Sequence, residues 1–192
     1  MPTVADNVLV ALTGSALVAP VGTTAPTLAT TTWAAAAAAW VDLGYVSEDG
    51  ITESHEDDTA EIPAWQRGDI VRRLITGSSA QYQLTLIETT KAALELYHKG
   101  SPVVGVHASG HGPASQQIVS PTVDRRAFGF DIIDGAKIVR MVIPQGEVTE
   151  RGEIVYKNDE PIGFELTVTA YPASNGVHTI KYYSDLAGLP LA

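Results

Sequence analysis

Cysteine is absent from the 192 residues of the sequence, and charged side chains make up only 18% of them. Without cysteine the fold does not depend on disulfides, and zinc sites of the cysteine type are excluded. An average globular chain is about 25% charged. Because 45% of the residues are hydrophobic, the chain can bury a large core. The low charge indicates that much of its remaining surface becomes covered by another molecule.

Lysine and arginine are also missing from the first 66 residues, which carry nine acidic residues. The first basic residue is Arg67, and the acids and bases after it nearly cancel, so the formal net charge of −10 comes mostly from one region. Nucleic-acid binding needs a basic surface, which this distribution does not provide. Apolar runs of roughly 18 residues, as in membrane spans, are absent, and the N-terminus lacks the basic region of a signal peptide.

The clearest local pattern is a strand that runs into a helix between residues 79 and 98. Tyr82, Leu84 and Leu86 alternate with polar residues, as in a half-buried strand. The helix formers of 91–98 follow, and Gly100 is placed as a helix C-cap. This pattern predicts a helix of about two to three turns that covers part of a sheet.

Strand patterns also fill the C-terminal half. The stretches 126–133 and 136–143 flank Asp134-Gly135, a strong hairpin signal. A turn at these two residues pairs Phe130 with Val139, and leaves Asp131 and Arg140 as a diagonal pair on the other face. The alternating residues 162–170 predict a regular strand, and Asn175-Gly176 predicts a further hairpin leading to 177–183. Residues 145–159 are expected to be loop or short strand.

The N-terminal third is less regular. Residues 7–13 are a plausible first strand, and residues 14–32, with few large side chains, are expected to form a loop or arm. Trp33 and Trp40 bracket an alanine-rich stretch that predicts a short helix. The two indoles pack either against the core or against a neighbouring molecule. Together these stretches form an expected N-terminal arm and Ala/Thr-rich loop at about 14–40.

A long acidic hairpin loop is expected at about 48–73. Its first strand is acidic, and its second strand, 69–76, is rich in β-branched and charged residues, as in one arm of a long hairpin. The acidic residues of the first strand are Glu53, Glu56, Asp57, Asp58 and Glu61.

Seven or eight strands and one helix predict a mainly β fold, either a β-sandwich or a squashed barrel of two packed sheets with one flanking α-helix and long loops. We expect a single domain over 1–192, with no extra C-terminal domain. The expected core residues are Tyr82, Leu84, Leu86, Phe128, Phe130, Phe164, Leu166 and Val168.

Motifs for catalysis or metal binding are weak. His107 and His111 have a ligand-like spacing, but the surrounding glycines and proline oppose a helix and no glutamate follows in the position of a zinc protease. The acids between Glu53 and Glu61 lack the alternation of a calcium-binding EF-hand loop. The nucleophile-elbow and phosphate-loop motifs are also absent. We therefore expect no enzymatic activity, no cofactor and no metal.

Several phrases resemble the major tail proteins of long-tailed bacteriophages, the tail tube subunits found in phages of actinobacteria. The phrases are WVDLGYVSEDG at 40–50, AWQRG at 64–68, VR at 71–72, LTLIE at 84–88 and LELY at 94–97. They are not catalytic motifs, and the resemblance is carried by their order and spacing over residues 40–98.

The resemblance implies a structural virion protein, assembled in the bacterial host cytoplasm into hexameric rings. These rings stack into a hollow tube through which DNA passes without specific binding. The implied partners are other copies of the chain and the tape measure, terminator and tip proteins of the tail. The hairpin that contacts the adjacent ring maps onto about Glu53 to Arg73. Expected contact residues are Glu53, Glu56, Asp57, Asp58, Glu61, Trp65, Arg67, Arg72, Arg73, Arg125 and Arg126, with Trp33 and Trp40 as possible contacts of the arm.

A rival interpretation from another functional class remains open at this point. A monomeric β-sandwich module that binds calcium or carbohydrate would share the composition and the strand patterns. Size-exclusion chromatography or negative-stain microscopy separates the two, because the rival predicts a small globular species.

Overall fold

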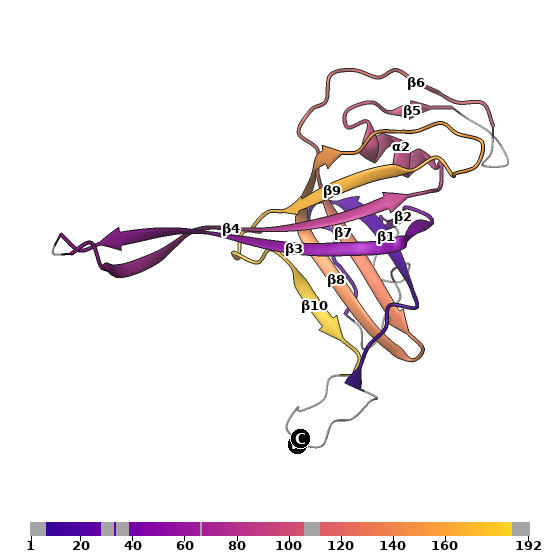
Figure 1. Ribbon diagram of the computed structural model, residues 1–192. Coiled ribbons are helices and arrows are strands. Elements are labelled where there is room, and N and C mark those ends of the chain that lie inside the picture. Colours follow the sequence, from indigo (N-terminus) through magenta and orange to yellow (C-terminus); the bar gives the residue numbers. More distant parts are fainter. Residues whose placement is uncertain (1–6, 28–32, 34–38, 66, 106–111, 186–192) are drawn as a thin grey trace.

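The computed structural model describes residues 7–27, 33, 39–65, 67–105 and 112–185. Within these ranges the chain has a mainly β, sandwich-like fold with one helix (Figure 1). The strands are β1 (Thr13–Pro20), β2 (Val41–Asp42), β3 (Val46–Pro63), β4 (Ile70–Leu86), β5 (Val103–Val104), β6 (Ser115–Gln116), β7 (Arg125–Asp134), β8 (Lys137–Arg151), β9 (Phe164–Ala170) and β10 (Ile180–Tyr183). The helix is α2 (Lys91–Tyr97). The predicted fold class is confirmed.

One long antiparallel sheet folds over on itself to make the two layers. Its order is β2-β1-β7-β8-β9-β4-β3, with β10 also paired to β8, while β5 and β6 form a small separate sheet. The first half of β8 pairs with β7 and β10, and its second half pairs with β9. The layers are therefore β2-β1-β7-β8-β10 and β8-β9-β4-β3. In the described ranges β2 and β3 do not pair with each other, so the sheet stays open and the squashed-barrel alternative is wrong.

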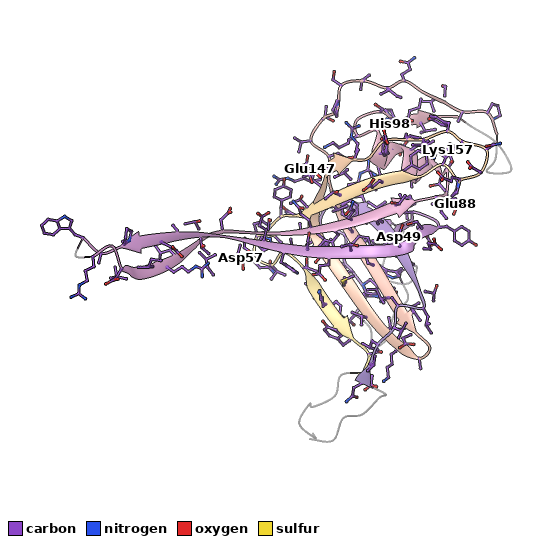
Figure 2. All side chains as sticks on the ribbon, in the orientation of Figure 1. Asp49, Asp57, Glu88, His98, Glu147 and Lys157 are labelled. Carbon is purple, nitrogen blue, oxygen red and sulfur yellow. The ribbon has the colours of Figure 1, made fainter. Side chains whose placement is uncertain are left out.

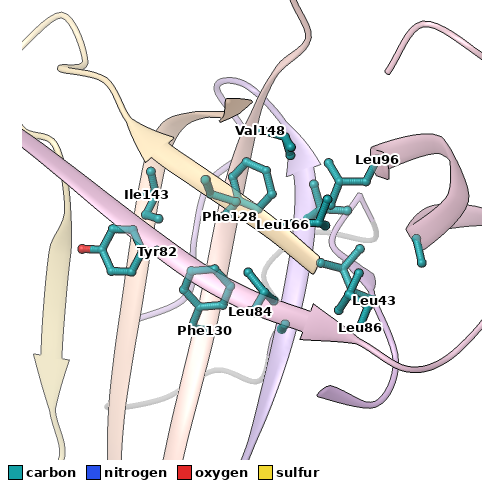
Figure 3. Close-up of a cluster of buried hydrophobic side chains, with 14 of the residues drawn as sticks. Leu43, Tyr82, Leu84, Leu86, Leu96, Phe128, Phe130, Ile143, Val148 and Leu166 are labelled. Carbon is teal, nitrogen blue, oxygen red and sulfur yellow. The ribbon is translucent and has the colours of Figure 1, made fainter. Parts of the chain in front are cut away.

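The core between the layers contains all eight residues expected there, each at most 3% exposed (Figure 3). The rings of Tyr82 in β4 and Phe130 in β7 lie 5.8 Å apart, although two strands separate them in the sheet order. Facing side chains from the two layers thus interdigitate, as in a sandwich.

The strand-to-helix junction also follows the prediction. The backbone N–H of Ala93 donates to the Thr90 hydroxyl (3.2 Å), which caps the helix N-terminus. The seven-residue helix ends at His98 as its C-cap, two residues before the predicted Gly100, which has a φ of +81° in the turn that follows. α2 packs on one end of the core, where the rings of Tyr97 and Phe164 lie 5.6 Å apart. The helix therefore covers an end of the sandwich and not an outer sheet face.

The hairpin of β7 and β8 forms one residue later than predicted. Asp134 pairs with Lys137, so Phe130 opposes Met141 instead of Val139. The two registers differ by two residues, and the side-chain period of a strand is two, so the apolar face of the prediction is kept. For the same reason Asp131 lies directly opposite Arg140, and the predicted diagonal pair is wrong.

The first strand, β1, lies later in the chain than predicted. Residues 7–12, expected as the first strand, are exposed and lie outside any strand, whereas β1 spans 13–20, of which 14–20 were expected as loop. Ala16 and Val18 face the core between the layers, while Leu17 and Ala19 belong to a second buried cluster on the outer face of the same layer. A strand buried on both faces shows no alternation, which is why period-2 reasoning missed it.

The second buried cluster contains both predicted tryptophans. Trp33 and Trp40 are 9% and 7% exposed, and their ring centroids lie 4.7 Å apart. The alternative that packs them against the core of the subunit is confirmed, and their assignment as possible contacts of the arm stays a prediction. The helix predicted between them lies mostly at 34–38, outside the described residues.

A buried ion pair anchors this cluster to the sheet. Arg140 donates to Asp131 through two hydrogen bonds of 2.7 Å, and Trp33 Nε1–H donates to the same carboxylate at 2.9 Å. The Arg140 guanidinium lies 4.5 Å from the centroid of the Trp33 ring. Gly129 makes room for that ring, since a Cβ there would lie 2.2 Å from it.

Two C-terminal predictions also change. β8 continues to Arg151, so the residues expected as loop or short strand pair with β9 as far as that residue. The turn at Asn175-Gly176 forms, with Gly176 at a φ of +78°, but it does not make a hairpin. The chain instead crosses to the other layer, where β10 pairs with β8. Local turn chemistry identifies a reversal of the chain but not the partner strand.

Candidate assembly interface

The most distinctive feature of the subunit is a two-stranded arm, which we define as residues 56–79. It is the outer part of the β3–β4 hairpin and projects from the body (Figure 1). β4 pairs with β9 only from Ala80 onward, so within the described residues the arm strands pair only with each other. The eight strand residues from Glu56 to Pro63 extend about 25 Å. A free two-stranded ribbon of this length is marginal in water, which indicates that a partner stabilises it.

A compact turn closes the arm. The backbone N–H of Ala64 donates to the carbonyl of Asp69 (2.6 Å), and that of Gly68 donates to the carbonyl of Ala64 (3.1 Å). Arg67 and Gly68 have φ values of +76° and +73°. Arginine rarely adopts positive φ, so the turn holds the backbone of Arg67 in a conformation that costs energy.

Large apolar side chains on the arm are exposed on both of its faces. Trp65 at the turn is 96% exposed, and Ile75 is 71% exposed. The others are Ile62, Ile70, Val71 and Leu74, from 37% to 65% exposed. Monomeric proteins rarely expose such a group of residues, and contiguous ones mark interaction sites. The β-branched residues of 69–76 predicted this strand, but they gave no indication that neither face would be covered within the subunit.

The charged residues of the arm fall into two zones. Glu56, Asp57 and Asp58 lie on β3 near the body and are exposed (Figure 2). Arg67, Arg72 and Arg73 lie toward the turn, where Arg73 has a weak contact with Glu61 (Arg73 Nε to Glu61 Oε1, 3.9 Å). The hairpin expected from the sequence is therefore a ribbon with an acidic base and a tip richer in arginine.

Glu53 belongs to a network inside the subunit and not to the arm surface. Its carboxylate accepts hydrogen bonds from Lys181 of β10 and from the Tyr82 hydroxyl (3.0 Å), and lies 2.8 Å from His55 Nε2. Partial burial alone would raise the pKa of Glu53, but the hydrogen bonds from Lys181, His55 and Tyr82 outweigh it and lower that pKa below its ordinary value. Burial, helped by the Glu53 charge, raises the pKa of Tyr82 to about 12. The network joins the root of the arm to the other layer of the sandwich.

We expect Glu53→Gln to lower the free energy of unfolding by about 1 kcal/mol at pH 7, because hydrogen bonds to a charged group are lost. A carboxyl group whose pKa is lower in the folded state than in the unfolded state stabilises the folded protein at a pH above the unfolded pKa. That stabilisation is lost as the pH falls through the folded pKa. The difference between the two proteins should therefore shrink below about pH 4.3, the ordinary glutamate value. Urea unfolding at pH 7 and pH 3 measures the difference in the free energy of unfolding. Glu56→Gln is the control, and it should change that free energy little at pH 7. Equal stability of wild type and Glu53→Gln at pH 7 would contradict this role.

The remaining predicted contact residues lie on the body. Arg125 stacks 4.7 Å over the ring of Tyr171, and Arg126 pairs with Asp124 at 2.9 Å. Both side chains therefore have partners on the body of the subunit, and their contact with the arm of another subunit stays a prediction.

The outer face of the β9-β4-β3 layer has an unusual composition. Its side chains, taken from the register of the three strands, are Thr52, Ser54, Gln81, Gln83, Thr85, Glu165, Thr167 and Thr169. Gln83 donates to Glu165 across the strands. This part of the described structure carries neither a cation nor a large apolar side chain. Such a face offers little to a protein partner and repels a polyanion.

Other kinds of site have no support in the described part of the chain. It holds no group of three or more His, Asp or Glu side chains arranged to bind a metal. His107 and His111 lie outside the described residues. None of the helices described is long and apolar enough to cross a membrane.

Comparison with known proteins agrees with this geometry. The family model described as phage tail tube protein matches residues 1–189, which is nearly the whole chain. No curated protein matches the chain.

Proposed function

The chain belongs to the phage tail tube protein family, and from this membership we propose that its subunits form rings of six that stack into the hollow tube of a long non-contractile tail. The protein is a structural component of the virion, and its role is assembly and not catalysis. DNA passes through the tube during delivery to the host. The other proposed partners are the tape measure, terminator and tip proteins, which join it during assembly in the host cytoplasm.

The observation that carries this proposal is the arm. A ribbon that projects about 25 Å from the body, with apolar side chains on both faces, becomes stable when another subunit covers it. A projecting element on one subunit and its receptor on the next form a heterologous contact, which propagates into rings or filaments. We assign the contact with the adjacent ring to the arm, including Glu56, Asp57, Asp58 and Glu61 and the residues Trp65, Arg67, Arg72 and Arg73.

The outer face of the β9-β4-β3 layer suits the wall of the channel. Its hydroxyl, amide and carboxylate groups are well hydrated and give passing DNA no cation to bind. The opposite outer face, on the β1-β7-β8 layer, is already covered by the cluster around Trp33 and Trp40. We therefore propose that the face with Gln83 and Thr167 points toward the lumen.

Changing Glu56, Asp57 and Asp58 together to Lys tests the role of the acidic base of the arm. We expect the triple variant to fold but to form no tubes, because its new cations would meet cations such as Arg125 and Arg126 across the ring junction. Electron microscopy of the purified variant gives the readout. Replacing the same residues with Asn and Gln is the control, and it should have a smaller effect.

Normal tubes from the triple Lys variant would contradict docking of the acidic base. If those tubes also bound DNA in a salt-sensitive way, the three acids would line the lumen instead.

A further inference from the structure

A groove lies at the end of the hairpin opposite the tip of the arm. It has a volume of about 700 Å³ and lies between the start of β1 and the start of β3, with Asp131 and Ile132 of β7 among its lining residues. Residues at the start of β3, from Val46 to Glu48 and Gly50 to Ile51, line the groove, while the other end of the same strand reaches the tip. Figure 2 shows Asp49 and Glu88 on the side of the body away from Asp57 of the arm. Each subunit therefore carries the projecting tip at one end and this groove at the other.

Charges in the groove are all of one sign. Asp42, Glu48 and Glu88 line it, and among its described lining residues there is no lysine or arginine. The carboxylates of Asp42 and Glu88 accept hydrogen bonds from the backbone N–H groups of Gly44 (2.9 Å) and Tyr45 (3.1 Å). These contacts orient the carboxylates without neutralising them, so the groove attracts cations.

The groove also has unused apolar surface and unpaired strand edges. Leu12 and Tyr45 are 68% and 76% exposed, and Ile51, which also lines the groove, packs against the core. β2 pairs with β1 only at Leu17 and Val18, so the first residues of β1 have one free edge, and β3 ends the sheet. In addition, the buried Oγ of Ser47 has no hydrogen-bond partner in the described structure. A partner that brings apolar groups, cations and a hydrogen-bonding group would fit here.

The tip of the arm, residues 62–73, has the complementary properties. It carries Arg67, Arg72 and Arg73 and the acid Asp69, and Glu61, the strand partner of Arg73, borders it. Trp65, Ile62 and Val71 add exposed apolar surface. Tryptophan and arginine are the residues most enriched among energetic hot spots of interfaces. Pockets of roughly 300–1,000 Å³ enclose ligands larger than one indole, so the groove has room for Trp65.

We propose that the tip of one subunit inserts into the acidic groove of the next subunit along the tube, with Trp65 against Tyr45 and Leu12 and the tip arginines against Asp42, Glu48 and Glu88. This proposal rests on the proposed function and identifies the receptor of the arm. The tip and the groove lie at opposite ends of β3, so repeated insertion stacks copies in one direction. About 15 residues of strand separate Glu48 from Pro63. This length limits the distance between successive copies along the tube to roughly 50 Å.

The absence of cysteine makes a clean cross-linking test possible. One batch of protein carries Arg67→Cys at the tip and a second carries Glu48→Cys in the groove, and both substitutions are at exposed positions. A short bis-maleimide reagent should link the two batches into heterodimers when they are mixed and assembled, and should link neither batch alone. A third batch with Thr167→Cys, on the sheet face away from the groove, is the control and should not link to Arg67→Cys.

Removing the indole gives a second measurement. Trp65→Ala should raise the protein concentration needed for tube formation roughly tenfold or more. Tyr156→Ala is the matched control, since Tyr156 is an aromatic residue that is 76% exposed on the body, and it should leave that concentration unchanged. Circular dichroism confirms that each variant is folded.

The outcomes separate this inference from the proposed function. Tubes that form with no link between Arg67→Cys and Glu48→Cys, or with Trp65→Ala as active as wild type, would overturn the groove as receptor and leave the tail-tube function standing. The same holds if Arg67→Cys links to Thr167→Cys instead. Wild-type protein that forms neither rings nor tubes would overturn the proposed function together with the groove.

Discussion

Deleting the arm is expected to abolish tube formation while leaving the subunit folded. His55 and Ala80 pair directly across β3 and β4, so a two-residue Asn-Gly turn can join them in place of residues 56–79. The core residues all lie outside this segment, and the network of Glu53 with Tyr82 and Lys181 is retained. Electron microscopy should show no tubes at concentrations where wild type forms them, because the contact that joins successive rings has been removed.

The control for this deletion is an arm of the same length with an unchanged tip. Replacing exposed Thr76 with Ser keeps the ribbon and should keep the tubes. If the deleted protein is folded by circular dichroism and still builds tubes of normal length, then the arm does not join the rings.

Truncating either of two buried aromatic rings should destabilise the subunit strongly. Phe130→Ala and Phe164→Ala should each lower the free energy of unfolding by roughly 3–5 kcal/mol, the cost of burying less apolar area and leaving a cavity. Phe130 is 0% exposed against Tyr82, and Phe164 is 2% exposed against Tyr97 of the helix. A loss of this size is a large part of the total stability of a typical domain.

Urea unfolding should be measured on the arm-deleted subunit, because assembly would add stability to the folded state by mass action. Ile118→Ala is the control, since Ile118 is 67% exposed and its truncation should change the free energy of unfolding little. Unchanged stability in both Phe variants would mean that the packing of the two layers is wrong.

The sandwich core was predictable where strands have one buried face. In β4 and β9 the alternation of Tyr82, Leu84 and Leu166 with polar residues follows the side-chain period of a strand, and these residues are all buried. β1 lacks this signal because both of its faces are covered, and its small residues resemble those of a loop. The partner of β10 could not be predicted either, since pairing between distant strands depends on how the whole sheet folds over.

The arm was predictable as a hairpin, but its surface properties were not. Acidic residues on 51–63 and β-branched residues on 69–76 indicate two strands, which pair as expected. Glu53 has the same residue type as Glu56, yet its carboxylate is held inside the subunit by Lys181, 128 positions away. The groove depends on a contact between the starts of β1 and β3, which no local pattern encodes.

Electron microscopy of the purified wild-type protein at high concentration is the decisive experiment for the proposed tail tube. We expect hollow tubes of stacked rings, with six subunits in each ring, the arm of each subunit reaching the next ring, and the face that carries Gln83 and Thr167 toward the lumen. Dispersed small particles at every concentration, or tubes whose arms point into solvent, would contradict it.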